Sequence, residues 1–412
     1  MFRGIQTSRV FCAGLAWLAC SAWAQAALPV TLKQAFDAAW LRQPEARSLD
    51  ARQAAADARR EAAGSWTPEP IAVELSSQSD RFNSNLGGRE TGAGLAIPLW
   101  LPGERARAGE LAHAESLAVA SRKQAAQLRT AALVREAWWN WHRARLALDL
   151  AQGVLDNTRQ LAADVSKRVK AGDLARSDQH QSDGAVASAE AAVAEAEGAL
   201  AGAVQQFAGL TALLPSAGGE PVTEPVPDNA AVMDPAAHPA IADLMDRAEV
   251  ARRLADLAGA RTRGAPELTV GATRERGAVN EAYRQSLTVG IRIPFGADSR
   301  YRAAVSTAQA DAIEAESLLG LERQKLAGEA QAAGARLTAA RTQAAAADRR
   351  AQLARESQGF FQKSFRLGES DLPTQLRIEL EAADAARQAA RARIDLAASI
   401  SALRQTLGLL PQ

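Results

Sequence analysis

The sequence predicts an α+β membrane protein built from two equivalent repeats, in which short β-hairpins continue into very long helices. Three observations support this prediction. Segments of the chain recur about 196 residues later, as Gly94-Leu95-Ala96-Ile97-Pro98-Leu99 does in Gly290-Ile291-Arg292-Ile293-Pro294-Phe295. Each half contains one proline-free helical stretch of about 70 residues and two strand-like segments. A duplication that keeps its register indicates two structurally equivalent halves.

The first 26 residues have the composition of an export signal. Arg3 and Arg9 supply a basic start, a short apolar stretch follows, and Ala24-Gln25-Ala26 offers a cleavage site. Cleavage two residues earlier and lipidation at Cys20 are the alternatives, although the Trp-Leu-Ala that precedes Cys20 is a poor lipobox. We therefore interpret residues 1–26 as a signal peptide.

Composition excludes several classes of protein. Both cysteines, Cys12 and Cys20, lie in the signal, so the mature chain has no disulfide, cysteine nucleophile or cysteine metal site. The formal charge of +1 becomes −1 when the two signal arginines are removed, which gives no basic excess for nucleic acid. The mature chain lacks an apolar run of about 18 residues, which excludes membrane-spanning helices. A periplasmic protein, a secreted protein or an outer-membrane barrel remains.

The first helix is predicted from its cap and its apolar face. Thr31 and Gln34 have the spacing of a capping box. Leu32, Phe36 and Trp40 then recur every four residues, which places them on one side of a helix. Most of the remaining chain is rich in Ala, Glu, Gln, Arg and Leu, a composition that favours helix throughout.

Two proline-free stretches, 104–171 and about 298–367, predict helices about 100 Å long. Each ends at a glycine, Gly172 or Gly368, and a helix of about 40 residues follows. Each half therefore predicts an antiparallel helical hairpin. Apolar residues in the first stretch have the spacing of a coiled-coil seam, which comprises Leu150, Val154, Leu161, Val165 and Val169.

The strand-like segments lie within 69–99 and 266–295, where apolar residues alternate with small or polar ones. This alternation is typical of transmembrane β-strands, and its recurrence in two hairpins strengthens a pattern that is weak in any single strand. Glu74 and Arg292 fall on the polar side of their strands. We therefore expect both side chains to face the lumen of a barrel.

Four strands cannot close a barrel, and an open sheet edge is not tolerated inside lipid. A barrel shared by three copies of the chain would have twelve strands and no edge. The alternative is a small soluble sheet that caps a coiled coil, but the helices have few large apolar residues to cover its apolar face. The sequence therefore favours a trimeric twelve-stranded β-barrel that is continuous with a long α-helical barrel.

The predicted organisation is a signal peptide, two repeats and a connector. The first repeat, 27–214, contains a helix, a β-hairpin, a long helix, a tip turn at Gly172 and a short helix. The second repeat, 239–412, has the same order, with its tip turn at Gly368. Residues 215–238 are rich in proline and form an irregular, equatorial connector between the two.

These features resemble the TolC family of trimeric outer-membrane efflux ducts over essentially the whole mature chain. The resemblance rests on Gln43-Pro44-Glu45 and His238-Pro239-Ala240 early in each repeat, on the two β-hairpins, and on the tip segments 169–178 and 365–372. The order and spacing of these motifs are specific, although no single motif is. The tip segments resemble the subgroup that works with heavy-metal pumps of the resistance-nodulation-division type.

The resemblance implies a passive, homotrimeric conduit in the outer membrane, in contact with outer-membrane lipid, with a twelve-helix tube in the periplasm. Its partners would be a periplasmic membrane-fusion adaptor protein and an inner-membrane resistance-nodulation-division pump. The residues at the periplasmic tip would contact the adaptor and form the aperture; they are Gly172, Asp173, Leu174, Ala175, Asp178, Gly368, Glu369, Ser370, Asp371 and Leu372.

The acids of the tip depart from the family pattern. The family usually has an acidic residue six positions after each tip glycine; Asp178 fits, whereas the second repeat has Thr374. Asp371 or Glu369 could line the aperture instead. The alternative is that these acids stabilise the N-termini of the short helices.

The sequence contains no recognisable catalytic or metal motif. No phosphate-binding loop, nucleophile elbow or His–Glu zinc motif occurs. The tryptophans of 138–141 either fill gaps between helices or form a stacking site. Trp66 and Trp100 adjoin the strands and would suit a membrane-interface belt. The four histidines lack metal-ligand spacing; they are His113, His142, His180 and His238.

The sequence therefore predicts a non-enzymatic outer-membrane channel of a tripartite efflux system, with heavy-metal cations as the favoured substrate. One alternative is an outlet for drug efflux or type I protein secretion. Another is a soluble periplasmic coiled-coil scaffold. We expect no cofactor and no nucleic-acid partner, and we expect the protein in the outer membrane of a Gram-negative cell, extending into the periplasm.

Overall fold

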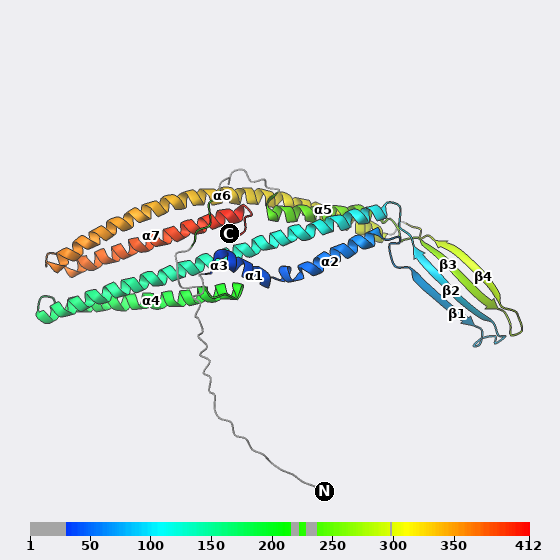
Figure 1. Ribbon diagram of the computed structural model, residues 1–412, viewed down its shortest axis with the longest axis horizontal. Coiled ribbons are helices and arrows are strands. Elements are labelled where there is room, and N and C mark those ends of the chain that lie inside the picture. The colour runs from blue at the N-terminus through cyan, green and yellow to red at the C-terminus, as the bar shows by residue number, and fades with distance from the viewer. Residues whose placement is uncertain (1–29, 216–221, 228–236, 297–298) are drawn as a thin grey trace, which may run out of the picture.

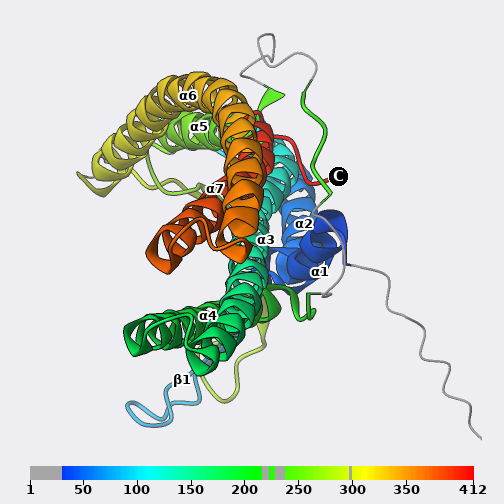
Figure 2. The ribbon, with the colours of Figure 1, turned by 90° about the vertical axis from the view of Figure 1, so that its left-hand side faces the viewer.

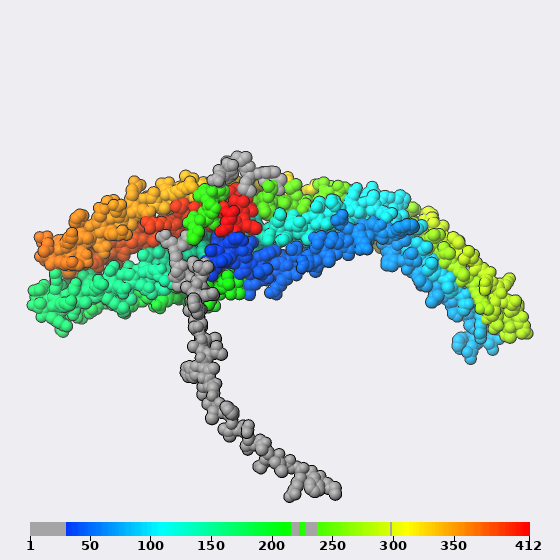
Figure 3. Space-filling model, in the orientation of Figure 1, coloured from blue at the N-terminus to red at the C-terminus, as the bar shows by residue number. Residues whose placement is uncertain are grey.

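The computed structural model describes residues 30–215, 222–227, 237–296 and 299–412. The predicted signal peptide and most of the predicted connector lie outside these residues. The described chain is elongated, with a sheet at one end, two connections between helices at the other end, and long helices between them (Figure 1, Figure 3). This shape leaves little room for a central core.

The two repeats contain corresponding elements. α3 and α6 have 68 residues each. The first repeat comprises α1 (Leu32–Arg42), α2 (Pro44–Gly64), β1 (Ala72–Ser79), β2 (Arg89–Pro98), α3 (Glu104–Ala171) and α4 (Arg176–Thr211). The second comprises α5 (Pro239–Ala260), β3 (Glu267–Arg276), β4 (Arg284–Arg292), α6 (Ser299–Arg366) and α7 (Leu372–Thr406).

Several helices begin at residues that satisfy, or do not need, the backbone N–H groups left free in the first turn. The capping box predicted for α1 is confirmed: the Gln34 amide donates to Thr31 Oγ1 at 3.2 Å, and the Thr31 amide donates to Gln34 Oε1 at 3.0 Å. Pro44 and Pro239 each occupy the first position of a helix, where the missing N–H is not needed. The prolines therefore mark equivalent starts of α2 and α5.

The helices form two antiparallel pairs toward the tips, α3 with α4 and α6 with α7 (Figure 2). Toward the sheet, α2 and α5 pack against α3, and α5 also packs against α6. In the predicted seam of α3, Leu161 and Val165 are buried. Val154 is only partly buried, however, and Leu155 beside it is buried instead. A straight helix drifts relative to a seven-residue repeat, so the contact line shifts along it.

The largest apolar cluster lies near the middle of the long axis of the molecule, where α1 meets α3, α4 and α7 (Figure 1). Phe36 of α1, Trp138 of α3, Phe207 of α4 and Ile394 of α7 contribute to it, all with exposed fractions of 7% or less. Part of the α6–α7 contact is made by alanines alone, namely Ala351, Ala385 and Ala389. Within the described residues, no helix combines the length and apolarity needed to cross a membrane.

Candidate functional site

The strand register gives the sheet one apolar and one polar face. The strands are antiparallel in the order β1-β2-β3-β4, so the β2–β3 pair joins the two repeats. Side chains alternate between faces along a strand. Three successive rows on one face contain only apolar residues: Ile97, Leu268 and Ile291; then Val73, Leu95, Val270 and Val289; then Leu75, Ala93, Ala272 and Leu287.

This apolar face is open to its surroundings on the single chain. Exposed fractions reach 68% for Val73, 80% for Leu75, 74% for Leu287 and 64% for Val289. No described helix makes an extensive contact with the strands, because the strands lie beyond the helix ends (Figure 1). A contiguous exposed apolar surface indicates an interface with protein or lipid.

The opposite face carries small, polar and charged residues. Glu74 and Arg292, which we predicted to face a lumen, both lie on it, and Arg292 Nη1 is 3.4 Å from Glu267 Oε2. Every carboxylate within the four strands lies on this face. Its charged residues are Glu74, Glu90, Glu267, Glu275, Arg284 and Arg292, and four acids with two bases give −2.

The sheet has two open edges. β1 pairs only with β2, and β4 pairs only with β3. The outer side of each edge strand therefore presents unpaired backbone N–H and C=O groups. The described chain offers no strand or helix that covers either edge.

The turn between α3 and α4 and the turn between α6 and α7 lie at the end opposite the sheet and have the same geometry. Gly172 and Gly368 adopt left-handed φ values of 87° and 80°. The Gly172 amide donates to Val169 O and the Asp173 amide to Arg168 O, at 3.1 and 2.9 Å. The second turn repeats both bonds, from Gly368 and Glu369 to Phe365 and Ser364. Glycine is required here because a left-handed residue closes this type of helix end.

The tip acids cap helices, and they do so differently in the two repeats. In the first repeat, Asp178 Oδ2 accepts from the Ala175 amide at 3.0 Å, from the third position of α4 back to its cap. In the second, Asp371 is itself the cap of α7, and its Oδ1 accepts from the Thr374 amide at 3.3 Å. The hydrogen bonds to Thr374 hold the pKa of Asp371 below its usual range. The helix-capping alternative therefore accounts for both acids.

An arginine links the two tips. Arg168, near the end of α3, donates from Nη1 to Phe365 O and from Nη2 to Arg366 O, both at 3.2 Å. Its guanidinium also lies 4.6 Å from the centre of the Phe365 ring. Arg168 therefore satisfies the last carbonyls of α6. Sequence reasoning missed this residue, since its position in the second repeat holds Ser364.

The remaining predicted tip residues divide into packed and exposed ones. Leu372 is 1% exposed and Leu174 is partly buried in the tip cluster with Leu161, Val165 and Phe365. The residues left exposed are Gly172, Asp173, Ala175, Gly368, Glu369 and Asp371, while Ser370 and Asp178 are partly buried. The structure thus gathers all ten predicted residues at one end of the molecule (Figure 1).

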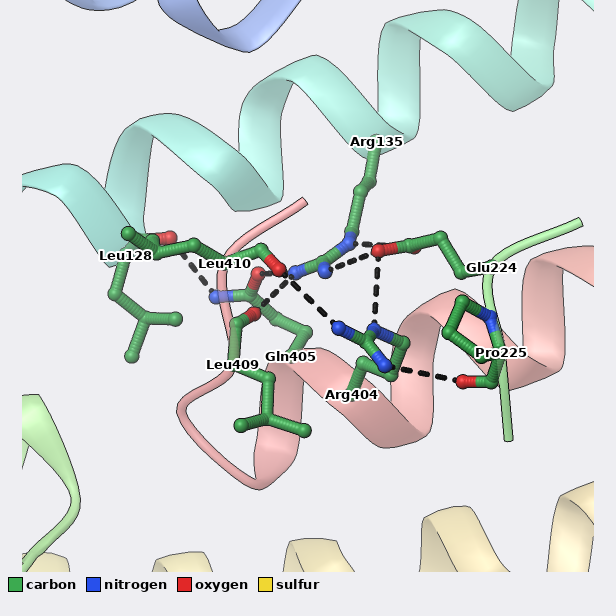
Figure 4. A network of polar contacts seen from close by, with 8 residues as sticks. All are labelled: Leu128, Arg135, Glu224, Pro225, Arg404, Gln405, Leu409 and Leu410. Carbon is green, nitrogen blue, oxygen red and sulfur yellow. Dashed lines mark hydrogen bonds and ion pairs between the residues drawn. The ribbon is translucent and has the colours of Figure 1, made fainter. Parts of the chain in front are cut away.

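A buried ionic network joins α3, α7 and the described part of the connector (Figure 4). Glu224, in the described part of the connector, accepts two hydrogen bonds from Arg135 of α3, at 2.7 and 3.0 Å, and one from Arg404 of α7, at 3.2 Å. The three side chains are 2–5% exposed. Arg135 also donates to Gln405 Oε1 and Leu409 O. This network fixes the connector against both repeats, and no motif in the sequence indicated it.

The tryptophan cluster is packed. Trp138, Trp139 and Trp141 are 3–7% exposed and surround His142, whose ring centre lies 4.2 Å from that of Trp141. The interpretation that these rings fill gaps between helices is confirmed. Burial lowers the pKa of His142 to about 4, because no described group compensates the loss of water around a charged imidazole.

The tryptophans next to the strands differ in exposure. Trp66 is 94% exposed, whereas Trp100 is partly buried and its Nε1 donates to Ser65 O at 3.2 Å. Across the described ranges, no group of three or more His, Cys, Asp or Glu is arranged to hold a metal ion.

No protein-family model matches this sequence, and no curated protein does. Solved structures do. The outer membrane protein VceC from Vibrio cholerae matches with a TM-score of 0.75 and 16% identity, covering 92% of this chain and 97% of that one. The chain has the fold of outer-membrane channels.

The CmeC outer membrane channel of Campylobacter jejuni matches with a TM-score of 0.74 and 13% identity, covering 98% and 94% of the two chains. The MtrE outer membrane channel of Neisseria gonorrhoeae, in its open state, gives 0.73 and 17%, covering 92% and 89%. The fold expected from the resemblance, a sheet continuous with long helices, is therefore confirmed at this level.

Proposed function

We propose that this chain is the outer-membrane channel of a tripartite efflux system and acts without catalysis. The single observation that carries the proposal is the sheet, whose apolar face is exposed and whose two edges are open. Lipid would cover the apolar face, and further copies of the chain would pair with the edges. A soluble scaffold would leave both uncovered, which disfavours that alternative.

The assembly that fits these edges is a homotrimer. Three copies, each with four strands, give twelve strands in a closed barrel with the polar face inward. Glu74 and Arg292 would then line the lumen. The paired helices would continue the wall into the periplasm, and the tip residues around Gly172 and Gly368 would meet a membrane-fusion adaptor and an inner-membrane pump of the resistance-nodulation-division type.

Heavy-metal cations are the favoured substrate. The net charge of −2 on the polar face of each sheet supports passage of cations, since three copies would place −6 along the lumen. The described residues hold no cluster of metal ligands, and a conduit does not require tight binding. The second candidate is an outlet for drugs or secreted proteins, which the same architecture would serve.

The proposal is tested by fractionation and by resistance. We expect the protein in the outer-membrane fraction, extracted only by detergent, as a trimer that dissociates on heating. Recovery in the soluble periplasm without detergent would refute it. A deletion strain should lose tolerance to zinc, cobalt, cadmium or copper. Unchanged metal tolerance with lost tolerance to detergents and dyes would replace the metal assignment with drug efflux.

A further inference from the structure

Charges in the strands are divided between the two faces of the sheet. All four carboxylates lie on the polar face. Arg89, Arg274 and Arg276 lie on the apolar face, which has no acid within the strands. Three arginines on the face that would contact lipid require an explanation, because a charge beside hydrocarbon is unfavourable unless an anion compensates it.

The arginines occupy only the end of the apolar face nearest the hairpin turns. Beyond the row of Leu75 and Leu287, the next row contains Arg274, and the row after it pairs Arg89 with Arg276. Each row adds about 7 Å along a strand. The three arginines therefore form a basic rim just past the apolar rows. This rim lies at the turn end of the sheet, which is the end away from the helices (Figure 1).

Nothing in the described chain neutralises this rim. The ion pairs among the strands join Glu275 to Arg284 and Glu267 to Arg292, both on the other face. Arg274 and Arg276 instead lie 4.1 and 5.1 Å from the centre of the Tyr283 ring, and Arg276 donates to Gly87 O. These contacts orient the guanidinium groups and leave their charge unpaired.

The acids of the hairpin loops are engaged in their own turns. Asp80 Oδ2 accepts from the Leu86 amide at 2.7 Å and from Ser84 Oγ at 3.0 Å. Glu281 Oε2 accepts from the Gly277 amide at 3.0 Å. Neither carboxylate forms an ion pair with an arginine of the rim, so the rim's counterion comes from outside the described part of the chain.

A second copy of the chain is not that counterion source. Arg89 lies on β2, and Arg274 and Arg276 lie on β3. Both strands are internal to the sheet, so their outward faces take no part in pairing between edges. In the proposed barrel this face meets only lipid, and its turn end meets the outer leaflet.

We propose that Arg89, Arg274 and Arg276 bind phosphate groups of the outer-leaflet lipid. This inference rests on the proposed outer-membrane barrel and adds a specific lipid partner to it. The guanidinium fork matches the geometry of phosphate oxygens, and Tyr283 places an aromatic ring at the same level, as membrane-interface residues do. The apolar rows bind the acyl chains, and the rim binds the charged headgroup.

The test uses the full-length trimer in detergent and measures binding of bis-phosphorylated lipid A by native mass spectrometry. Arg274→Gln should weaken binding about fivefold, and Arg89→Gln with Arg274→Gln should weaken it further by a similar factor, as expected for charges beside an anionic lipid. Arg284→Gln is the matched control, since it removes the same charge from the adjoining row on the opposite face. It should change binding less than twofold.

Two further probes identify the source of the phosphate. Monophosphorylated lipid A should bind the wild type more weakly, and inorganic phosphate at the same concentration should not compete. Equal loss in Arg274→Gln and Arg284→Gln, or full competition by inorganic phosphate, would overturn the inference. Wild-type protein that forms outer-membrane trimers but binds lipid A no better than the double variant would overturn this inference alone. Absence of the wild type from the outer membrane would overturn the proposed function with it.

Discussion

We predict that neutralising Glu224 destabilises the chain strongly, although the substitution hardly changes the shape of the side chain. Glu224→Gln keeps the size of the side chain and removes its charge. Arg135 and Arg404 would then remain together, each 4% exposed, with no carboxylate between them. Two like charges held in a protein interior without a counterion are strongly unfavourable.

The magnitude follows from the contacts that remain. Removal of one partner from a buried ion pair typically costs about 3–5 kcal/mol. The lower end applies here, because Arg135 keeps Gln405 Oε1 and Leu409 O, and Arg404 keeps Pro225 O. An unfolding entropy of about 2.1 cal/mol/K per residue gives about 0.8 kcal/mol/K for the chain without its signal peptide. A loss of about 3 kcal/mol therefore lowers the midpoint by about 4 °C.

The assay is thermal unfolding of the detergent-solubilised protein, followed by circular dichroism at one fixed scan rate. Glu190→Gln is the control, because Glu190 pairs with Arg159 at 2.8 Å while both side chains are about half exposed. An exposed pair contributes less than about 1 kcal/mol, so the control should shift by less than about 1 °C. Digestion by thermolysin, which cleaves before apolar residues such as Val232 and Met233, should also cut the connector faster in Glu224→Gln. Equal midpoints for the two variants would refute the reasoning.

Three smaller predictions concern the helices. Burial disfavours the charged form of His142 in the folded chain. Its contribution to the free energy of unfolding, at most about 3 kcal/mol, is therefore complete above pH 6.5 and is lost as pH falls toward about 4. Denaturant midpoints of His142→Phe should lack this pH dependence, and an unchanged pH dependence of the midpoint would contradict the assignment. Gly172→Ala should lower the free energy of unfolding by about 1 kcal/mol, because the φ of Gly172 is 87°. Gly153→Ala should raise it by about the same amount, because Gly153 lies inside α3 with open space around it. A change of the same sign in both variants would be inconsistent with this account. Arg168→Met should increase the rate of amide hydrogen exchange in residues 363–368 about fivefold, because it removes about 1 kcal/mol of helix capping. The control Lys167→Met removes a largely exposed charge one residue away and should leave this rate unchanged.

The main elements were accessible from the sequence because each depends on local residues. Thr31 and Gln34 are three positions apart, and their capping box needs no distant partner. The absence of proline predicts an unbroken α3, and Gly172 predicts its end. Alternation in 89–98 places Leu95 and Glu90 on opposite faces whatever strand lies beside them. These features require only the conformational preferences of local residues and the periods of helix and strand.

The contacts between distant segments could not be predicted in this way. Arg135, Glu224 and Arg404 meet through a connector that has no periodicity, and their charges look like those of any exposed residue in the sequence. Arg168 resembles its neighbour Lys167 in the sequence, yet only Arg168 reaches the end of α6. The roles of Asp178 and Asp371 also remained open, because the same acid can cap a helix or face an aperture.

The duplication explains why the central network has this composition. Counting back or forward 196 residues, Arg135 corresponds to Gln331 and Arg404 to Ala208, so neither repeat contains both arginines in equivalent places. Each repeat contributes one arginine, and the single connector contributes the carboxylate between them. Two identical repeats would require two such connectors, and the chain has one. The repeats must therefore differ where they meet the connector, and this network adds to the β2–β3 pairing and the α3–α5 packing that join the two repeats.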